Sequence, residues 1–543
     1  DDVESRGLGD VYKRQKYMFP LRILIVMLLH LQWERGNNMR YLPTGAQMKQ
    51  GDQKTITEMG MPSMVLMERA ALSVVEMMES EQLDLKKVLV VCGSGNNGGD
   101  GFAVARLLHL KGYAVDVWFV GKESSMTEET RLQKQIAVHY GVPVKERVGE
   151  DCYTVIVDAI FGIGLSRQVS GTYYNVIENL NQMDAIKVAV DIPSGLSADT
   201  GDVLGIAFAA DFTVTFAFQK IGMLFGMARK LVGKLVTASI GIEPSVYDGR
   251  GDVCYTYDRT DLKNLLPARD LDAHKGNYGK VLLIVGSPGM AGAAYFSAKA
   301  AYLTGAGLVQ IYTAKENQSN LQQLLPEAII TTYERYEEEK LKELLEWADV
   351  VGIGSGLSMS ETAQHLLSTT VRCVKKPCMI DADGLNILSK DRALFEKLTP
   401  DCILTPHMKE MAGLCGHSVK ELKEERFRYF QEFLGSIPSV CVMKDARTLV
   451  GRDGRPVYVN TSGNQSMAKG GAGDVLGGMI TGLLAQKIEP YEAGTLGVFL
   501  HGLAGDAAQK KKGSYSVLAS DILDGIAEVL TAESTEMILR EKC

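Results

Sequence analysis

The chain contains 543 residues, of which 46% are hydrophobic and 23% are charged, and this balance excludes a chain dominated by disorder, collagen or coiled coil. Lys and Arg number 58 against 66 Asp and Glu, so the net charge of −8 gives no basic footprint for nucleic acid. The nine cysteines form no CxxC pair, which argues against a disulfide framework and favours a reducing cytoplasm.

The first 38 residues differ in character from the rest of the chain. Residues 19–31 are almost wholly apolar but too few to cross a bilayer, and a basic flank precedes them as in a signal peptide. No small-residue cleavage site follows, and residues 10–15 (DVYKRQ) resemble a translated sequencing-library adapter. We therefore interpret residues 1–38 as an artefact or non-native leader, with Met39 as the natural start; a signal or anchor is the alternative.

A βαβ unit opens the remaining chain. Residues 86–92 form an apolar run typical of a strand, glycine-rich residues follow it, residues 102–112 have a helical pattern, and residues 113–120 are again typical of a strand. Further strands are expected at 154–162, 187–195 and 211–218. Ligands of open α/β sheets bind at the carboxyl ends of the strands, so the candidate residues of this half are sought there.

The glycine-rich turn at residues 93–98 (GSGNNG) matches GxGxxG, and Asp116 lies where a Rossmann ribose ligand would sit. Taken alone, this weak pattern indicates a NAD-dependent dehydrogenase. Its extension to NNGGDG adds two amide side chains and a carboxylate, and the amides of Gly98 and Gly99 are predicted to cradle a phosphate at a helix N-terminus. The alternative is that the polar residues only cap the helix.

Hard oxygen donors follow three of the predicted strands. Asn97 offers a carbonyl oxygen, Asp158 a carboxylate and Ser194 a hydroxyl. Such a set, without Cys or His, suits an alkali or alkaline-earth cation rather than zinc.

Four motifs of this half carry a family resemblance: NNGGDG (96–101), DAIFGIG (158–164), DIPSGL (191–196) and TFAFQKIG (215–222). Together they resemble the YjeF N-terminal family of NAD(P)HX epimerases, over residues 39–245. The resemblance implies a Rossmann-like fold, and it makes Asn97, Asp158 and Ser194 ligands of potassium. The substrate contacts that it implies are Asn96, Asn97, Gly98, Gly99, Asp100, Gly162, Ile163, Gly164, Leu165, Ser166, Arg167, Gln168 and Asp191. Asp191 is the expected proton-transfer residue, with Lys220 as a helper.

A polar, turn-rich stretch at residues 246–258 is interpreted as a linker to a second α/β domain, 259–543. Strands of this domain are predicted at 280–287, 307–313, 349–356, 377–384, 402–407, 439–445 and 448–451. The sequence KGGAGDVLGG (469–478) places glycines before a helix with Asp474 in its first turn. Backbone amides and the helix dipole there would form an anion hole for a transferring phosphoryl group. Asp474 would accept the proton of the attacking hydroxyl, although capping is the simpler alternative.

Residues 444–448 (KDART) follow a predicted strand and offer cations to nucleotide phosphates, the alternative being a solvated turn. His407 ends another strand, where it either reaches a ligand or caps a loop.

With these residues, GNYGKVLLIVGSPGMAGAAYFSAKAAYLTGAGLV (276–309), GIGSGL (352–357), DADGLN (381–386) and MAKGGAGDVLGGMI (467–480) resemble the NAD(P)HX dehydratase family. The resemblance implies a ribokinase-like fold, ADP or ATP as co-substrate with Mg²⁺, and NAD(P)HX contacts from Ala293, Gly356, His407 and Asp474. It assigns the nucleotide to Lys444, Asp445, Ala446, Arg447, Thr448 and Gly473. One departure is that the family's TPHPGE reads TPHMKE here, at 405–410.

The pairing of domains predicts a bifunctional repair enzyme for hydrated nicotinamide nucleotides. The first domain is expected to interconvert the R and S epimers of NAD(P)HX, and the second to dehydrate the S epimer to NAD(P)H with release of phosphate. The alternative is a ribokinase-type small-molecule kinase with a non-catalytic N-terminal binding domain. The resemblance also implies a cytoplasmic homo-oligomer, a tetramer, with no nucleic-acid or membrane partner.

Overall fold

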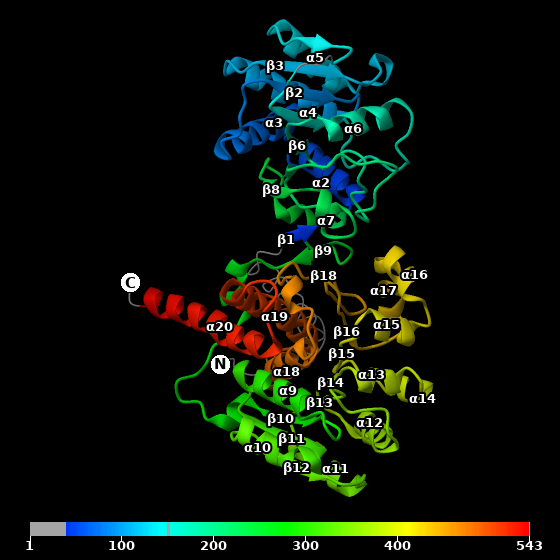
Figure 1. Cartoon of the computed structure of the whole chain (residues 1–543), viewed down its shortest axis with the longest axis vertical. Helices are drawn as coiled ribbons and strands as arrows, with labels where there is room; N and C mark the ends of the chain where they lie inside the picture. The colour runs from blue at the N-terminus through cyan, green and yellow to red at the C-terminus, as the bar shows by residue number, and fades with distance from the viewer. Residues whose placement is uncertain (1–39, 149–151, 542–543) are drawn as a thin grey trace, which may run out of the picture.

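A computed structural model describes residues 40–148 and 152–541 (Figure 1). The interpretation of residues 1–38 therefore lies outside the described residues. The chain forms two α/β units, each built on its own sheet, and the two units lie one above the other in Figure 1.

The first unit is built on a seven-stranded parallel sheet of order β4-β3-β2-β5-β6-β7-β8. Its strands are β2 (Val88–Cys92), β3 (Val115–Phe119), β4 (Val144–Lys145), β5 (Val155–Ala159), β6 (Ile186–Val190), β7 (Phe212–Phe216) and β8 (Lys234–Ala238). The five strands expected from the sequence are confirmed, and β4 and β8 are additional. The strand order reverses between β2 and β5, as in Rossmann-like folds, and this reversal opens a ligand crevice at the carboxyl ends.

Helices cover both faces of this sheet because its strands are apolar on both sides. Val88 and Val90 of β2 point into the core shared with α3, α4 and α5, whereas Leu89 and Val91 point into the core shared with α6. The helices of the unit are α2 (Gly45–Thr57), α3 (Ser63–Ser80), α4 (Asn96–Leu110), α5 (Glu128–His139), α6 (Thr172–Gln182) and α7 (Ala228–Leu231).

Helix α4 corrects the predicted helix at 102–112, because it begins at Asn96 with Gly95 as its N-cap. NNGGDG therefore forms the first six residues of the helix and not a loop before it. Glycine permits this start: a Cβ at Gly98 would lie 2.0 Å from the Gly93 carbonyl oxygen, and one at Gly101 would lie 2.5 Å from the Ala159 Cβ.

The second unit is built on an eleven-stranded sheet of order β1-β9-β18-β17-β16-β15-β14-β13-β10-β11-β12. Neighbours from β12 to β16 are parallel, β17 and β18 add antiparallel pairings, and the order reverses between β10 and β13. The strands are β1 (Arg40–Leu42), β9 (Cys254–Thr256), β10 (Lys280–Ile284), β11 (Leu308–Ala314), β12 (Ile329–Tyr333), β13 (Val350–Ile353), β14 (Cys378–Ile380), β15 (Cys402–Leu404), β16 (Val440–Met443), β17 (Leu449–Gly451) and β18 (Tyr458–Val459).

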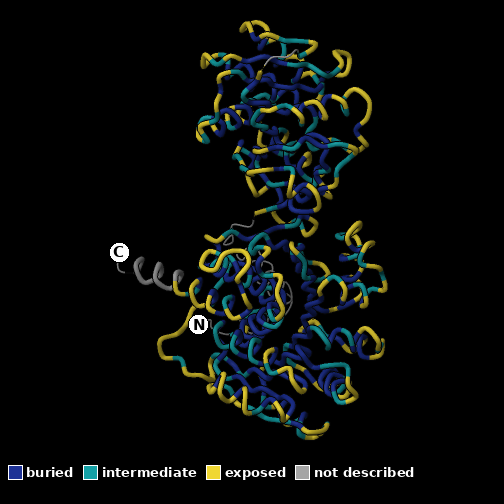
Figure 2. The backbone as a smooth tube through the Cα atoms, in the orientation of Figure 1, coloured by how far each residue is buried: buried dark blue, intermediate teal, exposed yellow. Residues whose placement is uncertain are grey.

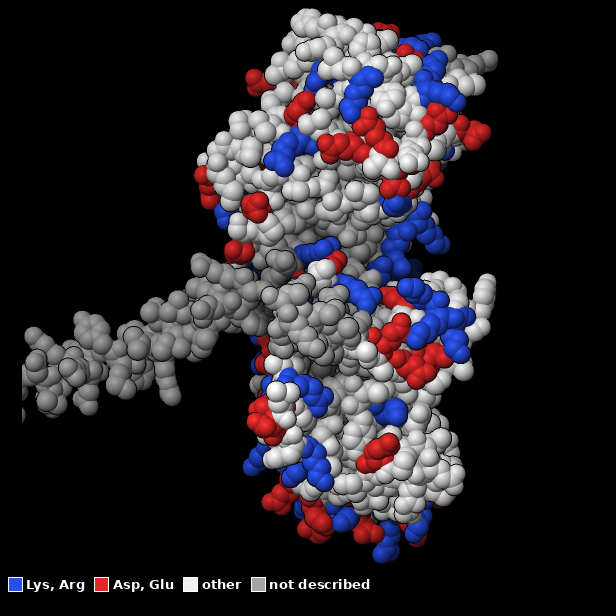
Figure 3. All heavy atoms as spheres, turned by 90° about the vertical axis from the view of Figure 1, so that its left-hand side faces the viewer, with Lys and Arg blue, Asp and Glu red and all other residues white. Residues whose placement is uncertain are grey.

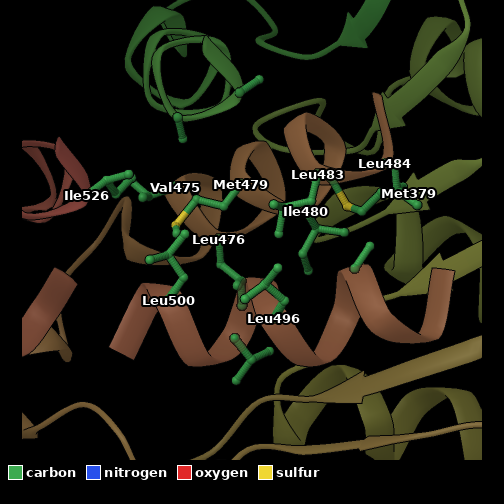
Figure 4. Packing of buried hydrophobic residues seen from close by; sticks show 14 of the residues in the cluster. Met379, Val475, Leu476, Met479, Ile480, Leu483, Leu484, Leu496, Leu500 and Ile526 are labelled. Atoms are coloured by element: carbon green, nitrogen blue, oxygen red, sulfur yellow. The ribbon is translucent and has the colours of Figure 1, made fainter. Parts of the chain in front are cut away.

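One face of this sheet packs against α9, α18, α19 and α20, and the other against α11, α12 and their neighbours. Helix α18 is almost wholly apolar, and Figure 4 shows its Leu476 and Ile480 directed towards Leu496 of α19. The helices are α8 (Leu262–Leu265), α9 (Ala291–Leu303), α10 (Gln318–Leu324), α11 (Glu338–Trp347), α12 (Glu361–Cys373), α13 (Asp383–Leu388), α14 (Arg392–Phe395), α15 (Met408–Cys415), α16 (Val419–Glu424), α17 (Arg426–Leu434), α18 (Ala472–Ala485), α19 (Pro490–Lys512) and α20 (Ala519–Glu541). The burial map shows buried backbone in the interior of both units (Figure 2).

The stretch read from the sequence as a polar linker is partly ordered and buried. Tyr247 is fully buried in the first core, and Tyr255 lies in β9, which pairs with β1 at the edge of the second sheet. The tyrosines supply apolar area that a count of polar residues overlooks.

Among the described residues no helix is long and apolar enough to cross a membrane. The cysteines of the same residues are all free thiols.

Candidate active sites

A cavity of about 840 Å³ opens at the carboxyl edge of the first sheet. Most of the residues predicted to contact a substrate line it: Asn96, Asn97, Asp100, Gly162, Ile163, Gly164, Leu165, Ser166, Arg167 and Asp191. Gly98, Gly99 and Gln168 are not among its lining residues. The NNGGDG turn, the loop after β5 and the residue after β6 therefore meet in one place, as the strand order requires.

Gly98 and Gly99 have a structural task that differs from the predicted phosphate cradle. Their amides donate to the Gly95 carbonyl oxygen at 2.8 and 3.4 Å, and their missing side chains allow the helix to press against Gly93 and Met67. A phosphate at this helix start would therefore use amides earlier in the turn.

Asp191 and Lys220 form a buried ion pair in the cavity wall. Lys220 Nζ lies 2.5 Å from Asp191 Oδ1, and only 1% of the lysine side chain is exposed. The same oxygen accepts from the Phe216 amide at 3.1 Å and the Thr215 hydroxyl at 3.2 Å. Asp191 has φ of 65°, a left-handed conformation that is uncommon for a non-glycine residue and is found at functional sites. The pair is thus held rigidly, with the carboxylate facing the cavity.

Two further carboxyl groups face the same cavity, and both titrate above the ordinary range. Burial raises the pKa of Asp52, on α2, to about 6, and the charge of Asp191 adds to the effect. Burial also raises the pKa of Asp100 well above its ordinary value, again helped by Asp191. Sequence reasoning missed Asp52. Its spacing of four residues from the buried Met48 places it on the core-facing side of α2, a position where a carboxylate needs an explanation.

The predicted cation ligands Asp158 and Ser194 lie together in the buried interior of the first unit. The Ser194 hydroxyl and amide donate to the two Asp158 oxygens at 2.6 and 2.7 Å, and burial raises the pKa of Asp158 to about 6. Asn97 is also buried and packs against Gly162, where a Cβ would lie 3.3 Å from its Oδ1. The side-chain nitrogen of Asn97, Nδ2, has no hydrogen-bond partner among the described residues.

The second candidate site lies where β14, β16 and the start of α18 meet. Lys444 Nζ pairs with the buried Asp381 at 2.6 Å, and a Cβ at Gly473 would lie 3.6 Å from this ammonium group. Burial, followed by the charge of Asp381, raises the pKa of Asp474 to about 6, and Lys444 opposes that rise. Asp474 is thus a desolvated carboxyl group at a helix start beside a fixed cation, an arrangement suited to proton transfer.

The hairpin loop at residues 444–448 connects β16 and β17, and its side chains have different environments. Asp445 pairs with Arg426 at 2.7 Å, and Thr448 donates to the Asp445 carbonyl oxygen at 3.2 Å. Arg447 donates to the Thr461 carbonyl oxygen at 3.3 Å, whereas Ala446 is exposed. The loop thus presents Lys444 and Arg447 as cations and uses Asp445 internally.

Ala293 and Gly356 adjoin each other: a Cβ at Gly356 would lie 2.9 Å from the Ala293 Cβ. His407 caps α15, because its Nδ1 accepts from the Lys409 and Glu410 amides, both at 3.1 Å. Its Nε2 lies 3.3 Å from Glu410 Oε1, and half of the side chain is exposed. Met408 takes the first helical position, so the departure from TPHPGE leaves an ordinary capped helix in this loop.

His501 of α19 was not singled out from the sequence. Burial lowers its pKa to about 4, and a contact with Ala472 places it behind the start of α18. Its Nε2 is buried without a hydrogen-bond partner among the described residues. The ring is therefore neutral near pH 7, and it contacts the backbone at the first residue of α18.

Comparisons with known proteins agree with this division into two sites. Residues 281–528 match the family model for NAD(P)H-hydrate dehydratase, and residues 63–222 match that for the YjeF-related protein N-terminus. The bifunctional NAD(P)H-hydrate repair enzyme Nnr of Moorella thermoacetica is 36% identical over 90% of this chain and 96% of its own. Its Escherichia coli K12 counterpart is 34% identical over 90% and 94%. A solved ADP/ATP-dependent NAD(P)H-hydrate dehydratase from Bacillus subtilis, co-crystallized with ATP/Mg²⁺, is 27% identical over 51% of this chain and 98% of its own, with a TM-score of 0.45.

Proposed function

The chain belongs to the family of bifunctional NAD(P)H-hydrate repair enzymes, and we propose here how its residues divide the work. The N-terminal, Rossmann-like unit is the NAD(P)HX epimerase, and the C-terminal, ribokinase-like unit is the ADP/ATP-dependent NAD(P)HX dehydratase. The expected domain bounds, 39–245 and 259–543, are kept in the proposal with two changes: β1 and β9 belong to the second sheet, and Tyr247 belongs to the first core.

The desolvated Asp474 beside Lys444 carries the proposal for the dehydratase. Asp474 takes the proton of the substrate's C6 hydroxyl as that oxygen attacks the terminal phosphorus of the nucleotide. Lys444 and the amides at the start of α18 stabilise the charge on the transferring group. The C6–O bond then breaks with orthophosphate as leaving group, pushed by the ring nitrogen lone pair, and loss of a C5 proton forms the double bond of NAD(P)H.

Several contacts complete this site in the proposal. Lys444, Asp445, Ala446, Arg447, Thr448 and Gly473 form the nucleotide side of the site, and Ala293, Gly356 and His407 form the NAD(P)HX side. Mg²⁺ would neutralise the nucleotide phosphates, and the buried carboxylate of Asp381 is an oxygen donor of the kind it prefers.

The Asp191–Lys220 pair carries the proposal for the epimerase. Inverting C6 requires either reversible opening of the ring or loss and re-addition of water, so a group that accepts and returns a proton must face that carbon. Asp191 is such a group, and Lys220 holds it by a charge-assisted contact at 2.5 Å. The NNGGDG turn and residues 162–168 then hold the rest of the dinucleotide.

Asn97, Asp158 and Ser194 would hold potassium. Asp158 and Ser194 contact each other in the buried interior, Asn97 is buried beside Gly162, and all three carry hard oxygen donors. A cation bound by them would offset the burial that raises the Asp158 pKa to about 6. When bound, the ion supplies positive charge near the substrate phosphates. A cytoplasmic homotetramer also belongs to the proposal, on the basis of the family resemblance.

The test uses the full chain with prepared NADHX, magnesium and potassium. We would follow recovery of the reduced-nicotinamide absorbance with ADP, with ATP and with neither. Recovery only with a nucleotide, carried beyond the S fraction faster than spontaneous epimerisation, is the expected result. A phosphorylated product that accumulates without NADH would instead indicate a small-molecule kinase.

A further inference from the structure

The two units meet at β1, which pairs with β9 of the second sheet, and at a short segment of the epimerase unit. This junction segment, residues 220–229, begins at the active-site Lys220, continues through the 3₁₀-helix η2 (Ile221–Leu224) and ends in α7. Ile221, Leu224 and Phe225 belong to the same buried apolar cluster as the strands and helices on one face of the second sheet. The contact is therefore a shared core and not two polar surfaces that touch.

Phe225 provides the most specific part of this contact. Its ring meets Phe427 edge to face, with centroids 5.3 Å apart and an interplanar angle of 90°. The guanidinium carbon of Arg426 lies 5.0 Å from the centre of the same ring, within the range of a cation–π contact. Both partners open α17 of the dehydratase unit. Phe225 therefore fixes the position of the first turn of that helix.

Arg426 passes this constraint to the loop at residues 444–448. Its guanidinium pairs with Asp445 Oδ2 at 2.7 Å, and only 15% of its side chain is exposed. Asp445 is the direct neighbour of Lys444, the cation that reaches Asp381 and the start of α18. Since an arginine held by an aromatic face loses less freedom when it binds a carboxylate, the ring over Arg426 favours one position of the loop.

A second effect of the junction segment reaches the same loop. Burial lowers the pKa of Arg447, and the nearby charge of Arg229, from α7, lowers it further. Basic side chains are visible where the two units meet (Figure 3). An anionic phosphate bound at the loop would relieve this repulsion.

We propose that Phe225, a residue of the epimerase unit, is a positioning residue for the nucleotide-binding loop of the dehydratase unit, acting through Arg426 and Asp445. The inference rests on the proposed assignment of residues 444–448 to the nucleotide. It means that the N-terminal unit supports the position of a loop in the dehydratase site, and that this supporting residue lies five positions along the chain from the active-site Lys220.

The test measures the binding of ADP with magnesium to the full chain by calorimetry, without NAD(P)HX, so that turnover plays no part. Phe225→Ala should raise the Kd for ADP about fivefold, which corresponds to loss of one cation–π contact. Met223→Ala is the matched control, because Met223 belongs to the same segment but packs in a cluster confined to the first unit. Its Kd should equal that of wild type. Phe225→Leu, which keeps apolar volume without the ring face, should raise the Kd as well and serves if Phe225→Ala does not fold.

A double-mutant cycle distinguishes positioning from general loosening. Arg426→Ala should raise the Kd about as much as Phe225→Ala, and the double variant should be no worse than either single variant. Additive effects, an unchanged Kd in Phe225→Ala and Phe225→Leu, or an equal rise in Met223→Ala would each overturn the inference. Lys444→Ala tests the nucleotide assignment separately from the positioning role. An unchanged Kd for ADP in Lys444→Ala would refute the nucleotide assignment itself. A raised Kd in Lys444→Ala together with an unchanged Kd in the Phe225 variants would refute only the positioning role.

Discussion

Replacing Asp474 by Asn tests the dehydratase mechanism most directly. The substitution keeps the size of the side chain and its place at the start of α18 but removes the proton acceptor. Removing a general base lowers a rate by about 10²–10⁴-fold. We expect NADHX dehydration with ADP to fall by that factor, while R and S epimers continue to interconvert, because Asp191 and Lys220 lie in the other unit.

The pH dependence provides a sharper signature. Burial and Asp381 raise the pKa of Asp474 to about 6, so the ionised form is in roughly tenfold excess at pH 7 and is the minor form at pH 5. The reaction needs the ionised form. The dehydration rate of wild type should therefore fall as the pH is lowered through about 6. We call this decrease the acid limb of the pH profile, and the small residual rate of Asp474→Asn should lack it.

The assay is the recovery of reduced-nicotinamide absorbance from S-NADHX between pH 5 and pH 8, with both substrates well below saturation, so that the rate follows kcat/KM and reports the pKa of the free enzyme. Glu492→Gln is the control. Burial raises the pKa of Glu492 to about 7, but the residue lies beside Arg455 at the start of α19 and away from Lys444. Its variant should keep the acid limb of wild type. An undiminished rate in Asp474→Asn, or a limb that persists in it, would refute the assignment.

Three further predictions concern the epimerase unit. Asp191→Asn should slow use of the R epimer about 10²–10⁴-fold and leave dehydration of the S epimer unchanged; loss of both would contradict separate sites. Gly98→Ala should destabilise the unit by about 1–3 kcal/mol in urea unfolding, since its Cβ would lie 2.0 Å from the Gly93 oxygen. Gly95→Ala, with open space at its Cβ, should not, and equal loss would refute the packing argument. Potassium, but not tetramethylammonium, should raise the Tm of wild type, whereas an equal rise in Asp158→Asn would exclude that ligand.

The central strands were predictable because buried parallel strands are continuous apolar runs. Strands β2, β5 and β10 all appear where such runs stand in the sequence. The strands that were missed lie towards the edges of the sheets and depend on a partner. Strand β4 has two residues, and β9 is set by pairing with β1, more than two hundred positions earlier in the chain. No local pattern contains that information.

The candidate site residues also differ in whether the local sequence could predict them. Asp191 and Asp474 stand in motifs at strand ends or helix starts, where the local sequence already indicates a ligand edge. Asp52 and His501 lie on helices far along the chain from those motifs, and only the fold brings them to a site. The junction segment is a stronger case, because nothing in residues 220–229 indicates contact with a loop at 444–448.

Each unit contains a carboxyl group near a helix start whose pKa is raised by burial and by a neighbouring carboxylate. A helix start favours the charged form of a carboxylate by about 0.3–1 kcal/mol, which would lower its pKa. Asp474 is nevertheless shifted upward from 3.8 to about 6, and two pKa units correspond to about 3 kcal/mol. Burial and the neighbouring Asp381 therefore outweigh the helix start and the opposing Lys444. Asp100, in the early part of α4, is raised by burial with Asp191 and Asp52 as its acidic neighbours. In both units a glycine-rich helix start allows a carboxyl group to be buried beside a second one, and in both the pKa of the buried group is raised above its ordinary value.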